Sequence, residues 1–195
     1  MGGNVKLQPY EGYYWQGKSV RLRPLRKSDA EKKWREWTDT HARRLLEYQL
    51  DLPPVSYEAY EADLEDSCEF KDTSRRISFA IETLDEEFVG WINLFKGGVK
   101  NGTFALGAAV FREHRARGYG YEALQLVLQY AFEELRMHKC NTECLAINEG
   151  SIRLQTKLGF VEEGRRRETV FMDGSHHDII LFGLTEEEYR TGKAS

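Results

Sequence analysis

Hydrophobic and polar residues alternate in several short segments of the first part of the chain. The alternating segments are residues 20–25, 77–82 and 104–110, and residues 88–95 form a nearly continuous apolar run. Alternation predicts half-buried β-strands, and a short apolar run bounded by turn residues predicts a buried strand. Polar or glycine-containing turns separate the last three segments, so we predict an antiparallel meander there.

Two helices are predicted between the first and second strands. Ser28 and Glu31 are spaced as in a capping box, in which each side chain bonds the backbone N–H of the other residue, so a helix should begin there. The pair Pro53-Pro54 then interrupts the chain before a second helix near residues 56–68. We call the segment from Ser28 to Asp72 the arm.

The spacing of apolar residues changes from two to 3.6 after Tyr119. This spacing predicts an amphipathic helix of about eighteen residues. Its apolar face would consist of Leu124, Val127, Leu128, Ala131 and Leu135. Residues 140–147 then form the next predicted strand.

The last part of the chain carries clear helix and turn signals. Asn148 and Ser151 would begin a short helix that Gly159 ends, since glycine suits the left-handed conformation of a helix C-terminus. Asp173-Gly174 predicts a tight hairpin between two final strands. Thr185 and Glu188 are spaced as a second capping box.

The predicted order of elements is β-α-α-β-β-β-α-β-α-β-β. It indicates an α+β (mixed α/β) fold with a mostly antiparallel sheet and helices on its faces. Within the 195 residues we expect a flexible N-terminal tail over residues 1–17 and one domain over residues 18–191.

Composition excludes several classes of protein. The formal net charge is -4, so a nucleic-acid-binding protein that relies on a strongly basic surface is not expected. Cys68, Cys140 and Cys144 are too few for a disulfide scaffold, and the last two are interpreted as small buried strand residues rather than zinc ligands. No apolar run approaches the roughly 20 residues of a membrane span. The first residues also lack the apolar segment of a signal peptide. We expect a cytoplasmic protein without a membrane partner.

The segment from Arg115 to Gly120 is the strongest candidate for chemistry. It lies between a predicted strand and the long helix, and its two glycines let backbone N–H groups approach a ligand closely. The helix N-terminus adds a partial positive charge, and Arg115 and Arg117 add cationic donors, which together suit a phosphate. The spacing matches neither nucleotide-binding glycine motif, so a nucleoside triphosphate or dinucleotide is not indicated.

An ordered set of motifs accompanies this turn. They are Arg115-x-x-Gly118-x-Gly120, Asn148-x-x-Ser151, Lys157-Leu158-Gly159-Phe160, Arg167-Glu168 and Asp173-Gly174-x-x-His177-Asp178. The chain thereby resembles the GNAT superfamily of acetyl-CoA-dependent N-acetyltransferases. Within it, the chain is similar to the RimJ/RimL-like branch, named for acetylation of ribosomal-protein N-termini. The resemblance extends over residues 19–189.

The resemblance implies a sheet of about seven strands that splays at its centre. It implies acetyl-CoA as cosubstrate, with its pyrophosphate at the glycine turn and its pantetheine arm in the splay, bonded like an added strand. No metal is expected. The implied binding residues are Val110, Phe111, Arg112, Arg115, Ala116, Arg117, Gly118, Tyr119, Gly120, Asn148 and Ser151.

The implied reaction is direct attack of an amine on the thioester. Many family members have a Tyr as the acid where this chain has Gln155, which cannot deliver a proton. In the RimJ/RimL-like branch the Ser of the N-x-x-S motif can take that role, which points to Ser151. The candidate bases are Glu168 and Glu143, with a water-relayed base as an alternative. His177 and Asp178 are expected to form structural hydrogen bonds.

The sequence says least about the acceptor substrate. We expect a primary amine, with a protein or peptide N-terminus first and a small cationic amine, such as a polyamine or antibiotic, second. The acidic residues of the arm fit attraction of a cation or a solvated helix face equally well: Glu58, Glu61, Asp63, Glu65, Asp66 and Glu69. Trp34, Trp37 and Tyr60 are interpreted as packing residues. A non-catalytic acyl-CoA sensor, a nucleotide-phosphate-binding module and a homodimer stay open.

Overall fold

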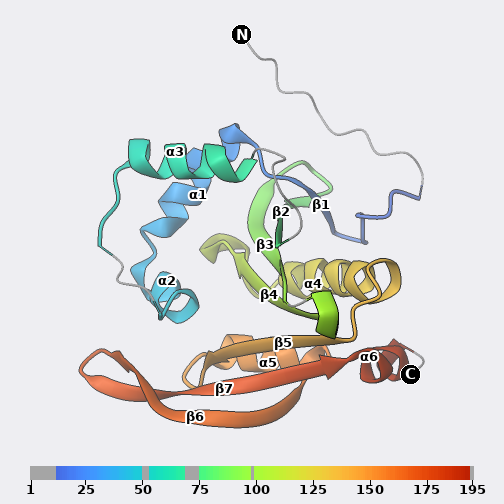
Figure 1. Cartoon of the computed structure of the whole chain (residues 1–195). Helices are drawn as coiled ribbons and strands as arrows, with labels where there is room; N and C mark the ends of the chain where they lie inside the picture. The colour runs from blue at the N-terminus through green and yellow to red at the C-terminus, as the bar shows by residue number, and fades with distance from the viewer. Residues whose placement is uncertain (1–11, 50–52, 69–74, 98, 194–195) are drawn as a thin grey trace.

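Seven strands form one sheet in the order β1-β2-β3-β4-β5-β7-β6 (Figure 1). The computed structural model describes residues 12–49, 53–68, 75–97 and 99–193. The strands are β1 Val20–Pro24, β2 Arg76–Thr83, β3 Phe88–Lys96, β4 Thr103–Val110, β5 Lys139–Leu145, β6 Val161–Met172 and β7 Ser175–Thr185. All neighbouring strands are antiparallel except β4 and β5, which are parallel. The predicted α+β class and the antiparallel meander from β2 to β4 are confirmed.

Six α-helices accompany the sheet in the described residues. They are α1 Ala30–Trp37, α2 Thr40–Leu46, α3 Tyr57–Cys68, α4 Tyr119–Gln129, α5 Glu149–Lys157 and α6 Glu186–Lys193. The chain after α4 continues as a π-helical turn over Tyr130–Glu134, so the long helical segment is close to its expected length. α5 and the final helix begin where the sequence predicts, and the Thr185–Glu188 capping box is formed in both directions.

The arm differs from its prediction in two ways. It contains three helices rather than two, because Asp39 caps an additional short helix, α2, by accepting a hydrogen bond from the backbone N–H of Ala42 at 3.2 Å. The Ser28 capping box is wrong. Residues Lys27–Asp29 form a 3₁₀ turn, and the Asp29 carboxylate accepts from the backbone N–H of Arg26 at 2.8 Å instead.

Helices cover both faces of the sheet. On one face the apolar sides of α4 and α5 pack with residues of the sheet, including Leu22 on β1, Ile92 on β3 and Phe104 on β4. On the other face α1 and α3 pack against a smaller cluster that contains Phe88 and Phe111. Trp34 contacts Tyr57 and Trp37 contacts Tyr60, so these aromatic side chains pack α1 on α3 as expected. Cys140 and Cys144 are buried in β5, also as expected.

The structure adds detail at the N-terminal tail and at the predicted hairpin. Residues 12–17 fall within the expected tail, yet Trp15 packs between Phe79 and Tyr130, with ring centroids 4.9 and 4.7 Å away. At the predicted hairpin, Asp173 and Gly174 both have positive φ, 52° and 76°. Two successive left-handed residues are the geometry of the hairpin turn that the Asp-Gly pair favours.

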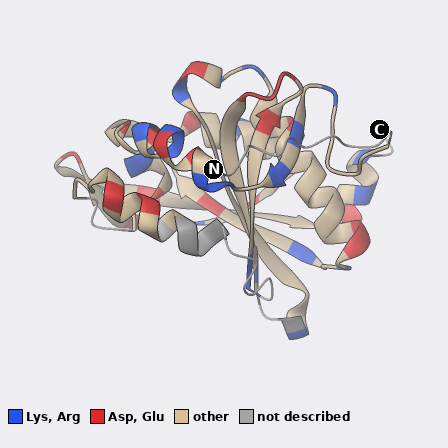
Figure 2. Cartoon of the chain, turned by 90° about the horizontal axis from the view of Figure 1, so that it is seen from above, with Lys and Arg blue, Asp and Glu red and all other residues tan. Residues whose placement is uncertain are grey.

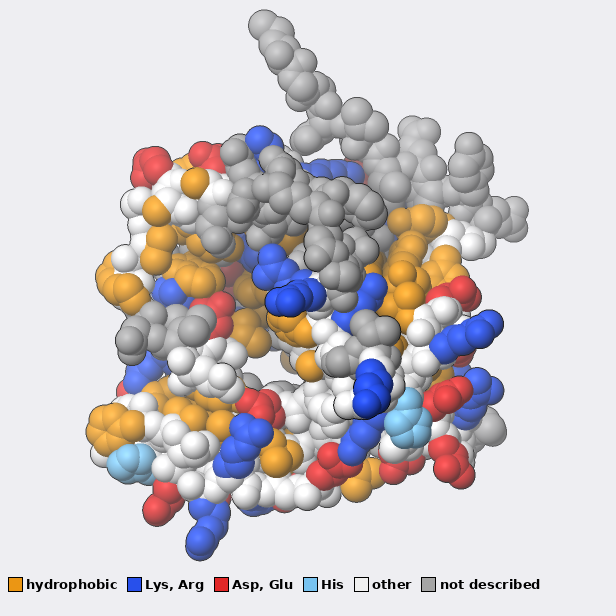
Figure 3. Space-filling model, in the orientation of Figure 1, with side chains coloured by type: hydrophobic (Ala, Val, Ile, Leu, Met, Phe, Trp, Pro, Cys, Tyr) orange, Lys and Arg blue, Asp and Glu red, His pale blue; other side chains and the backbone are white. Residues whose placement is uncertain are grey.

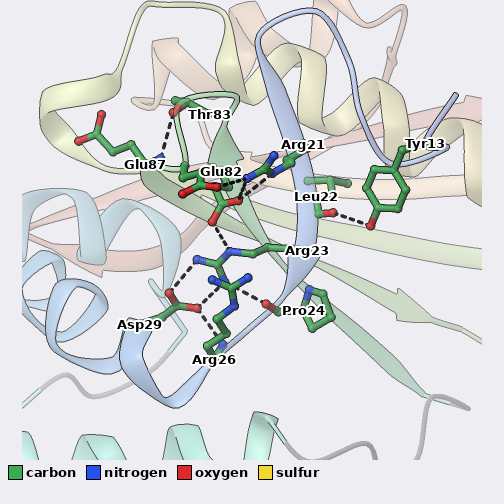
Figure 4. A network of polar contacts seen from close by, with 11 residues as sticks. Tyr13, Arg21, Leu22, Arg23, Pro24, Arg26, Asp29, Glu82, Thr83 and Glu87 are labelled. Carbon is green, nitrogen blue, oxygen red and sulfur yellow. Dashed lines mark hydrogen bonds and ion pairs between the residues drawn. The ribbon is translucent and has the colours of Figure 1, made fainter. Parts of the chain in front are cut away.

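Four buried charged residues join the arm to the edge of the sheet (Figure 4). The Glu82 carboxylate on β2 accepts from Arg21 at 2.8 Å and from Arg23 at 2.5 Å, both on β1. The Arg23 guanidinium also donates two hydrogen bonds to Asp29 at 2.7 and 2.8 Å. Burial acts to raise the pKa of Glu82, but the bonds from Arg23 and Arg21 outweigh it, so the pKa lies below its ordinary value.

Removing the charge of Glu82 tests this network. Glu82→Gln leaves two buried arginines without their shared anion, so we expect a loss of about 3–5 kcal/mol in the free energy of unfolding near pH 7. The pKa of Glu82 in the folded state lies below 4.5, its ordinary value. The difference in unfolding free energy between wild type and Glu82→Gln should therefore be full above pH 4.5 and should shrink as the pH falls through the folded-state pKa. Urea unfolding at several pH values measures both effects.

Glu162→Gln is the matched control, since Glu162 pairs with Arg165 at 2.8 Å on the surface. It should change stability little, because exposed ion pairs are weak. Equal losses in the two variants would mean that the buried network stabilises the fold no more than an exposed pair does.

Candidate functional site

β4 and β5 separate soon after they meet. They pair only at Thr103–Lys139 and Phe104–Cys140. By contrast, β3 pairs with β4 as far as Val110, and β7 pairs with β5 as far as Leu145. The later residues of both strands therefore keep a backbone edge without a strand partner. We call this the gap; it is the predicted splay, and Figure 3 shows the molecule hollowed in the region between the upper strands and β5.

A left-handed turn lies at the end of β4. Ala116 and Gly118 have φ of 62° and 86°, and Gly118 immediately precedes α4. A Cβ atom built on Gly118 would meet no atom within 4 Å, whereas one on Gly120 would lie 3.2 Å from Val110 Cγ2. The turn is thus open at Gly118 and closely packed at Gly120. The first N–H groups of α4 have no partner within the helix, and they fit an anionic ligand.

The two arginines of the turn differ in their contacts. Arg115 turns toward the arm, donating to the Val110 carbonyl at 2.9 Å and to Asp39 at 3.2 Å. Arg117 is exposed and bonds no other residue in the described part of the chain. Arg115 therefore fixes the end of β4 to α2, and Arg117 is the side chain of the pair that has its donors available.

The start of α5 brings several predicted residues together on the opposite side of the gap. Asn148 caps the helix, its Oδ1 accepting from the Ser151 backbone N–H at 3.1 Å. The Ser151 hydroxyl takes no part in this cap and instead accepts from Gln155 Nε2 at 3.1 Å. Gln155 in turn bonds the Thr142 hydroxyl on β5. Burial raises the pKa of the neighbouring Cys144 thiol, although hydrogen bonds with Ser151 and Gln155 act to lower it.

Glu143 lies on the other face of β5, because successive strand residues point to opposite faces. Its carboxylate accepts from the Tyr48 hydroxyl and from Gln49, both at 2.8 Å, and from Arg166 at 3.0 Å. Burial, and then the bond to Glu143, raise the pKa of Tyr48, so this phenol stays protonated. The carboxylate is thus enclosed by the arm on one side and by β6 on the other.

The structure does not bring Glu168 together with Glu143. Glu168 lies on β6, the edge strand, with β7 between it and β5. Its side chain is exposed and its φ is 51°, at a bulge whose backbone N–H donates to Asp178 at 2.9 Å. His177 bonds the Met172 carbonyl at 3.1 Å. His177 and Asp178 therefore form the structural hydrogen bonds that we expect of them.

Sequence reasoning missed three side chains of this region, and it missed the contacts of a fourth, Gln155. Gln155, Thr142, Tyr48 and Arg166 contact the candidate residues across distant parts of the chain. The helical spacing of Ser151 and Gln155, four residues apart, could have linked those two side chains. The other contacts depend on how the strands and α2 are arranged.

One group of described residues has the donor set of a metal site. The ligand atoms of Glu87, Glu113 and His114 lie within 4.8 Å of one another. The Lys32 ammonium group, however, lies 3.4 Å from Glu87 and 3.7 Å from Glu113, and so already balances the carboxylates. No helix among the described residues has both the length and the apolar character needed to cross a membrane.

Comparison with known proteins agrees with this architecture. A family model described as an acetyltransferase (GNAT) domain matches residues 19–161. The chain is 43% identical over 119 residues to the SPbeta prophage-derived uncharacterized N-acetyltransferase YokL of Bacillus subtilis, which covers 61% of this chain and 66% of that protein. It is 30% identical over 110 residues to YdaF of the same organism, provisionally named a ribosomal N-acetyltransferase, which covers 56% of this chain and 60% of YdaF.

A solved structure shares the fold over nearly the whole chain. It is spermidine N-acetyltransferase from Vibrio cholerae in complex with CoA and spermine, with a TM-score of 0.76 and 19% identity over 88% of this chain and 98% of that one. The family model covers more than half of this chain. The chain therefore belongs to the GNAT acetyltransferase family and is an acetyl-CoA-dependent N-acetyltransferase.

Proposed function

We propose that this protein acetylates a primary amine, first of all the N-terminus of a protein or peptide, at the gap between β4 and β5. The single observation that carries this proposal is the gap itself, with the open turn at one end, Ser151 on one face and Glu143 on the other. An extended ligand can bond the free strand edges as an added strand would.

The turn and the start of α4 are the proposed site for the phosphates of acetyl-CoA. The open backbone at Gly118 and the donors of Arg117 support this assignment. Of the residues that the sequence assigns to the cosubstrate, Arg115 has a supporting role in our proposal, because its guanidinium is already bonded to Val110 and Asp39. Val110, Phe111 and Arg112, at and just after the end of β4, would offer only the backbone groups that Arg115, Val89 and Glu36 leave unbonded. The Asn148 side chain would remain the cap of α5.

The proposed reaction joins the amine nitrogen to the acetyl carbon and breaks the bond between that carbon and sulfur. The ammonium must first lose a proton, for which we propose Glu143, directly or through water, because it lies on the separated part of β5. Glu168 stays an alternative on the edge strand. Ser151 would supply a proton to the departing thiolate, and the second proton that the nitrogen loses as the amide forms would restore the hydroxyl directly or through water. The overall change is ammonium and thioester to amide, thiol and one released proton.

Charge around the gap favours an acceptor with one positive charge. Asp39, beside the end of β4, is paired with Arg115 at 3.2 Å, and Glu143 on β5 is paired with Arg166 at 3.0 Å. Two carboxylates that already have cationic partners attract a polycation weakly, and a third, Glu36, already accepts from the Arg112 backbone N–H at 3.0 Å. A peptide N-terminus presents one charged amine, and its backbone can bond further along an open strand edge.

A polyamine is the second candidate. The structure from Vibrio cholerae with the same fold is that of a spermidine N-acetyltransferase in complex with CoA and spermine. Acidic residues also lie on α3 of this chain, at the outer side of the arm, whereas charges of both signs are interspersed elsewhere (Figure 2).

Arg117 tests the phosphate assignment. Arg117→Ala should weaken acetyl-CoA binding about tenfold or more, because a hydrogen bond to a charged group contributes about 1.5–3 kcal/mol. Calorimetry measures the dissociation constant, and Arg190→Ala on α6 is the matched control. Unchanged affinity in Arg117→Ala would contradict the assignment. Gly120 is a less specific probe, since a side chain there would also press on Val110.

Ser151 tests the proton donor. Ser151→Ala keeps the helix cap, which uses the backbone N–H of residue 151, so the fold should be unaffected. We expect kcat to fall by about 10²–10⁴-fold, the usual contribution of a general acid, with little change in KM for acetyl-CoA. A loss of less than about threefold would remove Ser151 from this role.

A screen of acceptors tests the proposed substrate. With acetyl-CoA at saturation, peptides with a free N-terminus should give a higher kcat/KM than spermidine, and the same peptides with a blocked N-terminus should be inactive. Raising the ionic strength until the Debye length falls from about 10 Å to about 3 Å should raise KM more for spermidine than for the peptide, since spermidine carries more charge. Faster turnover of spermidine than of every peptide would favour the polyamine.

A further inference from the structure

Thr142, Gln155 and Ser151 form a continuous chain of hydrogen bonds between β5 and α5. The Thr142 hydroxyl donates to Gln155 Oε1, and Gln155 Nε2 donates to Ser151 Oγ at 3.1 Å. Gln155 is 7% exposed, which is unusual for a side chain of this type. Its two polar groups are therefore both satisfied inside the protein, between the strand that borders the gap and the proposed proton donor.

We propose that Gln155 is a positioning residue that holds the Ser151 hydroxyl with its hydrogen directed toward the thioester sulfur. This inference rests on the proposed role of Ser151. A hydroxyl has one hydrogen and two lone pairs. Because the Gln155 amide fills one lone pair, Ser151 Oγ acts as an acceptor on that side, and its hydrogen points away from Gln155. The Cys144 sulfur is the protein's own acceptor for that hydrogen, and the thioester sulfur would take its place when the cosubstrate binds.

A serine without such a partner has a competing position. A serine hydroxyl in a helix readily bonds the backbone carbonyl three or four residues before it, and this would turn its hydrogen away from the gap. The bond from Gln155 opposes that rotation. Thr142 fixes the direction of the amide in turn, since its hydroxyl occupies the Gln155 oxygen and leaves the NH₂ group facing Ser151.

The same chain of donors strengthens the acid. Each donated bond polarises the next hydroxyl or amide, so hydrogen bonds in a low-dielectric interior strengthen one another. Cys144 is the titratable group beside the pair, and burial raises the pKa of its thiol, so it remains neutral. Gln155 cannot give up a proton itself. Together Gln155 and Ser151 supply, from two residues one helical turn apart, the fixed hydroxyl that a tyrosine would supply alone.

A double-mutant cycle separates positioning from packing. Gln155→Met keeps the length and shape of the side chain but removes its polar groups. We expect kcat to fall about tenfold, the worth of roughly one buried hydrogen bond, with KM for acetyl-CoA unchanged. In the Ser151→Ala background the same substitution should cost nothing further, because no hydroxyl remains to be held. Gln125→Met, at an exposed position of α4, is the control and should leave kcat unchanged.

Gln155→Glu gives a signature that a packing role would not produce. A protonated glutamic acid can donate to Ser151 as the amide does, whereas the carboxylate can only accept, and it would draw the Ser151 hydrogen toward itself. Burial raises the pKa of an introduced carboxyl group. The ratio of the kcat of this variant to that of wild type should therefore fall as the pH rises, and the ratio for Gln155→Met should stay flat.

The contact can also be measured in the free protein. The side-chain NH₂ resonance of Gln155, assigned by its loss in Gln155→Met, should shift in Ser151→Ala and in Thr142→Val but not in Gln125→Met.

Three results would overturn the inference. If the Gln155 NH₂ resonance did not shift in Ser151→Ala, the hydrogen bond between Gln155 and Ser151 would be absent in solution. An equal loss of kcat for Gln155→Met in both backgrounds would mean that Gln155 does not act through Ser151. An undiminished kcat in Ser151→Ala would instead show that Ser151 is not the proton donor, so that there would be no donor to position. This outcome differs from an equal loss for Gln155→Met in both backgrounds, because there the kcat of Ser151→Ala is still low.

Discussion

The separation of β4 from β5 is the constraint on which the rest of the structure depends. Backbone N–H and C=O groups that leave a sheet need other partners. The protein supplies some of these partners itself, since the Val110 carbonyl accepts from Arg115 and the Arg112 N–H donates to Glu36. The remaining edge groups are available to an extended ligand, which would complete the sheet by the same hydrogen bonds that a strand would make. The unpaired strand edges can therefore serve as a binding surface.

Helices on one face of the sheet and the arm on the other fix the distance between β4 and β5. On one face α4 and α5 share an apolar cluster that contains residues from both parts of the sheet, such as Phe104 on β4 and Ile180 on β7. On the other face the arm contacts both borders of the gap: Glu36 accepts from the Arg112 backbone N–H at the end of β4, and Tyr48 bonds Glu143 on β5. The arm therefore bridges the two borders of the gap.

Much of the fold follows from local patterns, and most of the site does not. The strands, α4 and the Asp173-Gly174 hairpin were predictable because periodicity and turn preference act within a few residues. Helix α2 was missed, because Thr40–Leu46 is too short to carry a clear helical period. The glycine turn and Asn148 were visible as motifs. The partners of Glu143 and of Gln155 were not, because 95 residues separate Glu143 from Tyr48 and 13 separate Gln155 from Thr142.

A helix begins at Ala30, close to the predicted start, but the predicted Ser28 capping box does not form. Ser28 has the right spacing to cap the arm, but Asp29, its neighbour, is drawn into the buried network by two bonds from Arg23. The same carboxylate accepts from the Arg26 N–H, so a tertiary ion pair decides where the 3₁₀ turn begins. Buried ion pairs are weak sources of net stability, but a half-broken one is costly, and this makes them sensitive to geometry. Because Arg23 also bonds Glu82 on β2, the entry of the arm is tied to one position on the sheet.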